Sequence, residues 1–385
     1  MTGSLDKLRV LDFSRILAGP FATMQLADLG AQVTKVERPG QGDDTRGWGP
    51  PHDSTGQATY FQAVNRNKDS IVLDLRDAHD QAEARRLALA ADVLVENFRP
   101  GVMAGYGLDY DQLRPHNEGL VYCSITGFGR GEGAGLPGYD LLIQALGGLM
   151  SVTGSAGGEP QKVGVAVVDV LAGLYATTGI LAALHHRRSG GGGQRIDIDL
   201  LSCLLAALVN QASGYTSAGV VPGRMGNQHP SIAPYELLPC ADGDLVLAVG
   251  NDRQFGELCA VLGAAHLTTD VRFATNAARV AHRPELRHEL GTLLASKTAE
   301  DWAAALAAVR VPAGVVNDLA GAFALADRLG LEPIVELPRE DGTSVPLVRS
   351  PLNLSATPPV YHSAPPALPA HAVTSRGHDA GRADQ

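Results

Sequence analysis

The chain has 385 residues, 45% of them hydrophobic and 19% charged, and this length predicts two or three domains around large apolar cores. Its formal net charge of −10 argues against a general surface for nucleic acid or an anionic membrane, but it allows a local basic pocket for one phosphorylated ligand. The four cysteines show no CxxC spacing, which favours buried free thiols in a reducing compartment. Because the N-terminal MTGSLDKLRV carries charges where a signal peptide has an apolar run, we expect a cytoplasmic protein.

The first forty residues predict a compact strand–helix–strand unit. Residues 8–14 are typical of a buried strand, 21–30 of a helix that ends at Gly30, and 31–38 of the next strand. Such a unit commonly opens a doubly wound α/β fold, in which ligands bind at the carboxyl ends of parallel strands. The first turn, SRILAGP, lacks the glycine fingerprint of dinucleotide-binding proteins, which weakens a nicotinamide or flavin interpretation.

The strand and helix pattern then continues along the chain. Further elements are expected at 70–77 (strand), 78–91 (helix), 92–98 (strand), 118–129 (strand) and 138–150 (helix). The glycine-rich loop before the last helix is interpreted as a mobile active-site loop, because Pro137 and Gly138 stand where the helix of a phosphate cradle would begin. Asp140 lies in the first turn of that last helix, where the helix dipole alone often favours a carboxylate.

Residues 163–200 form the most distinctive stretch of the chain. Its first 22 residues are almost wholly apolar or small, with the carboxylate of Asp169 among them; a basic run, four glycines and the alternating QRIDIDL follow. This pattern predicts a buried helix, a glycine stop and a strand. Burying an unpartnered carboxylate costs several kcal/mol, so three interpretations of Asp169 compete. The helix could be a transmembrane segment, the carboxylate could be a structural cap or ion-pair partner, or it could be a nucleophile or acid–base group at the positive end of a helix.

The second half of the chain predicts a smaller domain and a return to the first. The expected elements are a helix at 200–215, hairpins at 235–250 and 331–354, and mostly helices over 251–330 with an interruption at 311–316. The Pro- and Ala-rich tail from Ser355 is expected to wrap a surface or to be partly disordered. The domains are therefore expected at 1–205 (large α/β), 206–230 (linker and glycine loop), 231–330 (small α+β) and 331–385 (return to the large domain). The sequence lacks zinc-protease, P-loop and paired CxxC motifs and its histidines are scattered, so no metal is expected.

Several segments between about residues 5 and 360 resemble, in the same order, the class III coenzyme A transferases, also called the CaiB/BaiF family. The segments are LRVLDFSRILAGPFATMQLADLGAQVTKVERPGQGDDTRGW, DVLVENFRPGVM, SITGFG, GYDLLIQALGG, DVLAGLYATTGILAAL and GNQHP. The resemblance implies an open Rossmann-like domain with a smaller domain, and a homodimer whose two subunits interlock like links of a chain. It also implies acyl-CoA and a carboxylic acid as substrates, and it places the family's catalytic aspartate on Asp169.

The family's coenzyme A contacts carry over to this chain position by position. They imply binding residues at Leu17, Ala18, Arg38, Leu73, Asp74, Leu75, Arg76, Asn97, Phe98, Arg99, Pro137, Gly138, Tyr139 and Asp140. A glycine loop at Gly226, Asn227 and Gln228 is expected to supply backbone N–H donors for oxyanions. An arginine at a strand end suits phosphates because a guanidinium makes bidentate contacts. Two departures stand out: Leu17 replaces the glutamine of formyl-CoA transferases, and Ala104–Gly105 replaces a basic residue.

The implied reaction moves coenzyme A between carboxylic acids. Asp169 attacks the acyl-CoA thioester to give an aspartyl–acyl anhydride, the CoA thiolate returns to form an aspartyl-CoA thioester, and the acceptor acid reverses these steps. The closest alternative is an α-methylacyl-CoA racemase on the same fold. Those racemases carry a histidine where this chain has Tyr139, a poor base at neutral pH, which leaves His229 as the other candidate base. A non-catalytic nucleotide-binding or scaffold protein and a dehydrogenase are more distant alternatives, and the donor and acceptor acids stay open.

Overall fold

The computed structural model describes residues 3–371, which form two compact units. The first unit holds residues 3–147, 164–212 and 332–371, and the second holds 148–163 and 213–331. The segment 148–163, which the sequence places in the large domain, packs with the second unit instead, and the first unit extends to residue 212 rather than 205. Each unit is described by itself below.

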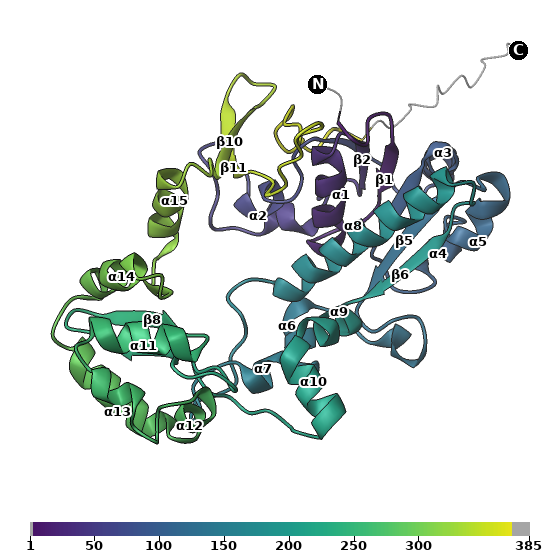
Figure 1. Cartoon of the computed structure of the whole chain (residues 1–385). Helices are drawn as coiled ribbons and strands as arrows, with labels where there is room; N and C mark the ends of the chain where they lie inside the picture. The colour runs from purple at the N-terminus through teal and green to yellow at the C-terminus, as the bar shows by residue number, and fades with distance from the viewer. Residues whose placement is uncertain (1–2, 372–385) are drawn as a thin grey trace, which may run out of the picture. The chain divides into compact units, whose positions relative to one another are not determined.

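The first unit is built on a six-stranded parallel sheet in the order β3-β2-β1-β4-β5-β6 (Figure 1). The strands are Arg9–Asp12 (β1), Gln32–Glu37 (β2), Lys68–Val72 (β3), Val93–Glu96 (β4), Val121–Thr126 (β5) and Arg195–Asp199 (β6). The order reverses between β1 and β4, which is the Rossmann arrangement, and ligands of such folds bind outside the carboxyl ends of the strands at this point. The predicted α/β fold with a Rossmann-like parallel sheet is confirmed.

Helices cover the sheet and connect its strands. In the first unit they are Ala18–Asp28 (α1), Asp44–Gly47 (η1), Thr59–Gln62 (α2), Ala78–Ala90 (α3), Val102–Gly105 (α4), Tyr110–Leu113 (α5), Arg114–His116 (η2), Glu132–Gly135 (η3), Asp140–Leu146 (α6), Val167–Arg188 (α8) and Leu200–Ala207 (α9). The long α8 runs alongside α1 (Figure 1). Gly173 allows this approach, because a Cβ there would lie 2.8 Å from the carbonyl oxygen of Ala18.

Packing in the first unit accounts for part of the apolar character of α8, because 39% of its apolar window is buried. By length and composition α8 is the one helix of the described residues that could cross a membrane, a test that the core helix of a soluble protein also passes. The buried face of α8 includes Val168, Ala172, Ala176 and Ile180.

Three of the four cysteines, Cys123, Cys203 and Cys259, are buried and free, whereas the free thiol of Cys240 is partly exposed.

Three predicted elements have different bounds. The third strand ends at Val72, so the residues expected to complete it, 73–76, form the loop that follows. The helix expected at 200–215 is broken between α9 and Val209–Ala218 (α10), because Val209 has a left-handed φ of 38°. The helix expected at 138–150 ends at Leu146, and Gly148, with φ 85°, separates it from the short Leu149–Val152 (α7).

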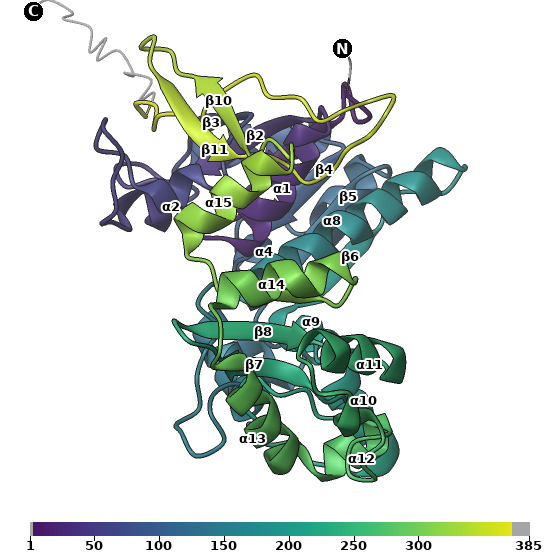
Figure 2. The same ribbon diagram turned by 60° about the vertical axis from the view of Figure 1, so that its left-hand side comes forward.

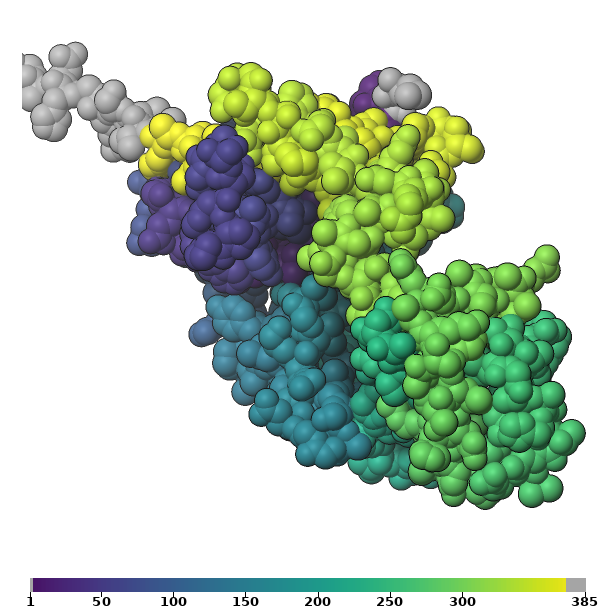
Figure 3. All heavy atoms as spheres, turned by 90° about the vertical axis from the view of Figure 1, so that its left-hand side faces the viewer, coloured from purple at the N-terminus to yellow at the C-terminus, as the bar shows by residue number. Residues whose placement is uncertain are grey.

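The C-terminal segment returns to the first unit and packs on its N-terminal part (Figures 2 and 3). It begins with the antiparallel hairpin Ile334–Pro338 (β10) and Ser344–Val348 (β11). Arg66, which pairs with the buried Asp28 at 2.6 Å, donates to the carbonyl oxygen of Val348 at 2.8 Å. Asn67 donates from its amide to the carbonyl oxygen of Val360, also at 2.8 Å. Buried polar side chains therefore hold residues from the two ends of the chain together.

The second unit is a small α+β arrangement around one apolar core. Its antiparallel sheet has the order β7-β8-β9, with Tyr235–Pro239 (β7), Asp244–Ala248 (β8) and Ala313–Val315 (β9). Besides α7 and most of α10, its helices are Asp252–Val261 (α11), Ala265–Thr268 (η4), Asn276–Ala281 (α12), Arg283–Leu294 (α13), Ala299–Ala308 (α14) and Leu319–Arg328 (α15). The interruption expected at 311–316 is strand β9. Phe255, Leu290 and Trp302 are among the residues that fill the core.

The connection from β5 to α6 depends on a backbone contact between two glycines. A Cβ added to Gly127 would lie 2.5 Å from the Cα of Gly138, too close for any real contact. We expect Gly127→Ala to lower the free energy of unfolding by about 1–3 kcal/mol, the usual cost of overpacking. Gly135→Ala, whose Cβ would meet nothing within 4 Å, is the matched control in the same loop. Equal urea midpoints for the two variants would contradict this account.

Candidate active site

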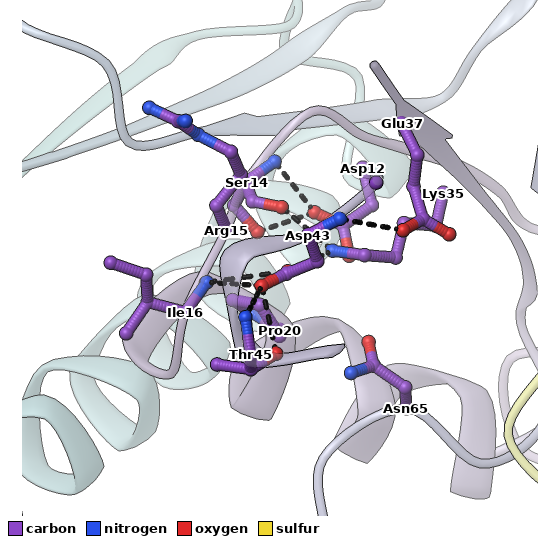
Figure 4. A network of polar contacts seen from close by, with 12 residues as sticks. Asp12, Ser14, Arg15, Ile16, Pro20, Lys35, Glu37, Asp43, Thr45 and Asn65 are labelled. Carbon is purple, nitrogen blue, oxygen red and sulfur yellow. Dashed lines mark hydrogen bonds and ion pairs between the residues drawn. The ribbon is translucent and has the colours of Figure 1, made fainter. Parts of the chain in front are cut away.

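A group of buried charges lies beneath the carboxyl ends of β1 and β2 (Figure 4). Lys35 Nζ contacts the carboxylate of Asp43 at 2.8 Å and donates to the carbonyl oxygen of Ser14 at 2.8 Å. Lys68 Nζ contacts the carboxylate of Asp12 at 3.2 Å. Burial alone would raise the pKa of Asp12, but Lys68 and Lys35 lower it, so this carboxylate is ionised at neutral pH. Burial lowers the pKa of Lys68 to about 8.

These charges hold the turn between β1 and α1. Ile16 has a left-handed φ of 72°, and its N–H donates to the Asp43 carboxylate at 3.3 Å. Asn97 holds the preceding residue, Arg15, because its side chain accepts from the Arg15 N–H at 2.9 Å and donates to the Arg15 carbonyl at 2.7 Å. A β-branched residue in this region is strained by about 1–3 kcal/mol, and such strain persists only where the surroundings fix it. Buried polar contacts thus shape the turn that lacks the usual glycines.

Two cavities open beside this turn and share Arg15 and Phe98 in their walls. The first, about 850 Å³, includes five residues expected from the sequence, Arg38, Leu73, Asp74, Leu75 and Arg76. The second, about 1050 Å³, includes Leu17, Ala18, Asn97, Phe98, Arg99, Pro137, Gly138, Tyr139 and Asp169. The structure therefore gathers most of the expected site residues of the first unit around two adjoining cavities. Their contacts with coenzyme A stay predictions.

The first cavity presents guanidinium groups at strand ends. Arg38, just after β2, pairs with Asp44 at 2.5 Å, and Arg15 pairs with the other oxygen of Asp44 at 3.2 Å. Arg76 contacts both oxygens of Asp74 at 2.9 Å and holds the pKa of that carboxyl at about 2. The guanidinium groups of these three arginines suit an anion such as a phosphate, because they can make bidentate contacts with it. Sequence reasoning missed Arg15, which lies where the two cavities meet.

Asp169 lies in the first turn of α8 and in the wall of the second cavity. Burial raises its pKa, and the negative charge of Asp140 adds to the effect, so the pKa reaches about 7. A structural carboxylate would be expected to pair with a cation. Within residues 3–371 no cation affects the pKa of Asp169, which is raised by burial and by Asp140 alone. The positive end of α8 favours the ionised form, which is the nucleophilic one. Asp169 can therefore ionise near neutral pH while facing a cavity.

Tyr60, in α2, is a neighbour of Asp169 that sequence reasoning missed. Burial raises the pKa of its phenol, and the charges of Asp169 and Asp140 raise it further. Its ring packs edge-on against Trp48 at 5.3 Å between centroids. The phenol therefore stays protonated at neutral pH and can donate a hydrogen bond near the carboxylates. The irregular loop before α2 offers no periodic pattern from which this position could have been predicted.

Comparison with known proteins decides the family. The model of CoA-transferase family III matches residues 5–372. The chain belongs to CoA-transferase family III, and it is a CoA-transferase. It is 46% identical to the succinate–glutarate CoA-transferase of Agrobacterium fabrum, over 95% of this chain and 93% of that protein. It is 39% identical to the succinyl-CoA:mesaconate CoA-transferase of Haloarcula hispanica, over 96% of this chain and 94% of that protein. A solved structure of a CaiB/BaiF family protein from Brucella suis is 45% identical in sequence. It matches with a TM-score of 0.84 over 96% of this chain and 97% of that protein.

The CoA-transferase site does not favour the racemase alternative. Among the described residues that line the second cavity there is no histidine, and Tyr139 stands at the start of α6 with 60% of its surface exposed. His229 belongs to the second unit, where its ring packs against Tyr235 at 5.3 Å between centroids. The reported relatives are named as transferases. Racemisation needs a second acid–base group opposite the first, and beside Asp169, whose pKa is raised to about 7, the described cavity wall offers no side chain with a near-neutral reference pKa.

The expected glycine loop belongs to the second unit, whereas Asp169 belongs to the first. Gly226 has a φ of 63°, and its N–H donates to the carbonyl oxygen of Gly154 at 2.9 Å; Asn227 follows in the same turn. The side chain of Gln228 donates to Glu236 at 3.1 Å. Glu236, which is buried, also pairs with Arg287. The loop is thus anchored within its own unit, and its role as an oxyanion-binding loop stays a prediction.

A three-residue group at the start of α3 has the composition of a metal site. One ligand atom from each of Asp77, His79 and Asp80 lies within 4.8 Å of the others. Asp77 is used as a helix cap, because its carboxylate accepts from the backbone N–H of His79 at 2.8 Å. Asp80 accepts from the N–H of Asp74 at 2.7 Å. Asp77 thus serves as the cap of α3, and Asp80 is engaged with Asp74 and, at 2.7 Å, with the ring of His371.

The raised pKa of Asp169 gives a stability prediction that is independent of activity. Its pKa is 3.8 in the unfolded chain and about 7 in the folded one, so ionisation opposes folding. The free-energy cost of ionising Asp169 in the folded protein is absent below pH 4, grows as the pH rises, and is complete above pH 7. We expect Asp169→Asn to stabilise the protein at pH 8 by on the order of a few kcal/mol and to have little effect at pH 4. Thermal melts at both pH values test this, with Asp69→Asn, an exposed carboxylate on β3, as control. An equal or lower melting temperature at pH 8 would refute it.

Proposed function

We propose that this CoA-transferase moves coenzyme A from succinyl-CoA to a short dicarboxylic acid such as glutarate, with Asp169 as the group that carries each intermediate. The observation that carries the proposal is a carboxylate in a cavity wall, without a cationic partner among the described residues, whose pKa is about 7. The acids are supported by the names of relatives that match nearly the whole chain, which specify succinate with glutarate and succinyl-CoA with mesaconate.

The proposed chemistry needs no external reactant. An Asp169 oxygen attacks the thioester carbonyl, the carbon–sulfur bond breaks, and CoA leaves as a thiolate beside an aspartyl–succinyl anhydride. The thiolate attacks the aspartyl carbonyl, which releases succinate and leaves an aspartyl-CoA thioester. The acceptor carboxylate then attacks the carbonyl of this thioester, the carbon–sulfur bond breaks, and the CoA thiolate leaves beside an aspartyl–acceptor anhydride. The thiolate finally attacks the acceptor carbonyl of this anhydride, which gives the new acyl-CoA and frees the carboxylate of Asp169. Each step exchanges one activated acyl bond for another, so the free energy of the thioester is conserved.

The two cavities suit the two ends of an acyl-CoA. The arginines of the first cavity, Arg15, Arg38 and Arg76, suit the phosphates, which a guanidinium binds in a bidentate manner. The second cavity would then hold the thioester beside Asp169. Arg99 lines this second cavity and is exposed, so it can pair with the distal carboxylate of a dicarboxylic acyl group. Leu17 gives the cavity an apolar side chain where formyl-CoA transferases have an amide, which argues against oxalate as a preferred acceptor.

The direct test combines product analysis with trapping of the intermediate. With succinyl-CoA and glutarate, we expect glutaryl-CoA and succinate in equal amounts, and much slower transfer to oxalate. With succinyl-CoA and hydroxylamine, mass spectrometry should find a hydroxamate on the peptide that contains residue 169. Asp169→Ala should abolish both results, whereas Asp69→Ala on the exposed edge of β3 should preserve them. Turnover by Asp169→Ala, or an adduct on another residue, would overturn the assignment.

We further propose that the protein is a homodimer. Helices α6, α8 and α9 pack against one another in the first unit, and they expose several large apolar side chains. These are Leu141, Leu142, Leu146, Leu174, Tyr175, Leu205 and, just beyond α9, Val209. Monomeric proteins rarely expose contiguous apolar patches of this kind, so a second copy that covers them is favoured. The interlocked arrangement implied by the resemblance stays a prediction.

Sedimentation measurements test the dimer. We expect a dimer that persists on dilution to nanomolar concentration, as an extensive apolar interface would require. A double variant, Leu146→Glu with Leu205→Glu, should weaken it by placing charges in the covered surface. Val271→Glu, at an isolated exposed position of the second unit, is the control and should remain dimeric. A folded wild-type monomer at micromolar concentration would contradict the proposal.

A further inference from the structure

The start of α8 is held by a side chain from a different helix. Its own N-cap residue, Ala166, offers no side-chain acceptor. Asp140, in the first turn of α6, supplies one instead, since its Oδ1 accepts from the N–H of Val168 at 2.8 Å and from that of Asp169 at 3.4 Å. Its Oδ2 accepts from the side-chain amide of Gln144 at 2.6 Å. Gln144 is fully buried, so this arrangement is fixed from both sides.

This placement differs from the role that the family resemblance implied for Asp140. The residue was expected to contact coenzyme A, but it is absent from the described lining of both cavities. Both of its carboxylate oxygens are instead engaged inside the first unit. The carboxylate consequently sits behind Asp169, at the backbone N–H of the nucleophile rather than at the ligand. A negative charge in this position opposes a second negative charge on Asp169.

We propose that Asp140 is a positioning residue with two separable effects on CoA transfer: its oxygen fixes the first turn of α8, and its charge drives Asp169 toward the covalent intermediates. This rests on the proposed role of Asp169 as the nucleophile. In the free enzyme, when Asp169 is ionised, its negative charge lies close to that of Asp140, which accepts from the backbone N–H of Asp169. When Asp169 becomes an anhydride or a thioester, its negative charge passes to the CoA thiolate or to the released carboxylate, and the repulsion between the two aspartates disappears. The charge of Asp140 thus destabilises the reactant state more than the acylated state.

The other charged and titratable groups around Asp169 do not replace this effect. Arg15 and Arg99 line the same cavity, from the loops after β1 and β4, and arginines stay charged throughout the accessible pH range. Tyr60, in α2, has a raised pKa and stays neutral there. Tyr139 lies at the cavity wall, beside Asp140 in the chain. The described residues that line this cavity include no histidine. The acid limb of the pH profile of the rate should therefore report the ionisation of Asp169.

Two substitutions of Asp140 separate its oxygen from its charge. Asp140→Asn keeps an amide oxygen for the N–H of Val168, and Gln144 can rotate its own amide to remain a partner. Asp140→Ala removes both the acceptor and the charge. The matched control is Asp199→Asn, because Asp199 caps α9 in the same way, accepting from the N–H of Ser202 at 2.7 Å. The control should leave the acid limb of the pH profile in place.

For Asp140→Asn we expect the acid limb of kcat/KM for succinyl-CoA to move to lower pH by roughly one unit, because Asp169 then ionises more easily. The fraction of enzyme trapped by hydroxylamine at pH 8 should fall several-fold, since the repulsion no longer favours acylation. The melting temperature should stay within a few degrees of wild type. Asp140→Ala should show the same shift of the acid limb together with a clearly lower melting temperature, because α8 loses its cap.

A thermodynamic cycle keeps this proposal distinct from the assignment of the nucleophile. The gain in melting temperature from Asp169→Asn at pH 8 should be smaller in the Asp140→Asn background than in wild type, whatever reaction Asp169 performs. An unchanged acid limb, unchanged trapping and an equal gain in both backgrounds would overturn the role of the Asp140 charge. An adduct on a residue other than Asp169, with the cycle as expected, would instead overturn the nucleophile and leave the coupling of the two carboxylates intact.

Discussion

The contact between Lys35 and Asp43, buried and 2.8 Å long, is the interaction on which the ligand-facing edge of the first unit depends. The carboxylate of Asp43 holds the N–H of the left-handed Ile16, and Lys35 holds the carbonyl of Ser14, so both sides of the first turn are fixed from beneath. Rossmann folds usually make this turn with glycines, which adopt a left-handed backbone without strain. Here the strain is offset by buried charges. Removing one partner would leave an unpaired ion in the interior, a change that typically costs 3–5 kcal/mol.

The two carboxylates at the start of α8 are held close together although their like charges repel. The charges of the buried pair beneath the first turn attract, whereas Asp140 and Asp169 repel each other, and burial adds to the cost of ionising Asp169. Folded proteins tolerate such a pair only where the surroundings are stable enough to hold it. Hydrogen bonds such as those that Arg66 and Asn67 donate to carbonyl oxygens of the C-terminal segment contribute to that stability. The unfavourable free energy of two neighbouring carboxylates is therefore confined to the start of α8, where the proposed acylation of Asp169 can relieve it.

The sequence was sufficient for the parallel sheet and for the long helix that carries Asp169 near its start, because apolar runs between turn residues are local signals. The catalytic role of Asp169 came from the family resemblance and stays a prediction. The resemblance to the CoA-transferases named Arg38 and Asn97 as site residues, and both line the cavities at the carboxyl ends of strands, where ligands of such folds bind. The break at Val209 was missed because the apolar periodicity runs through it. The cap that Asp140 places on α8 was missed because it joins residues 28 apart, and no local pattern records such a contact.

The shared wall of the two cavities bears on how a CoA-transferase of this kind can avoid losing its thiol. In the proposed reaction the thiolate leaves the donor and must return to the aspartyl carbonyl before water or the released acid does. If the first cavity anchors the phosphates as proposed, the thiolate stays tethered, and its return is an intramolecular step with a high effective concentration. Arg15 and Phe98, which belong to both walls, would then connect the anchor to the reacting end. Binding free energy gained far from the thioester then raises the rate of the second step, and it contributes to kcat as well as to KM.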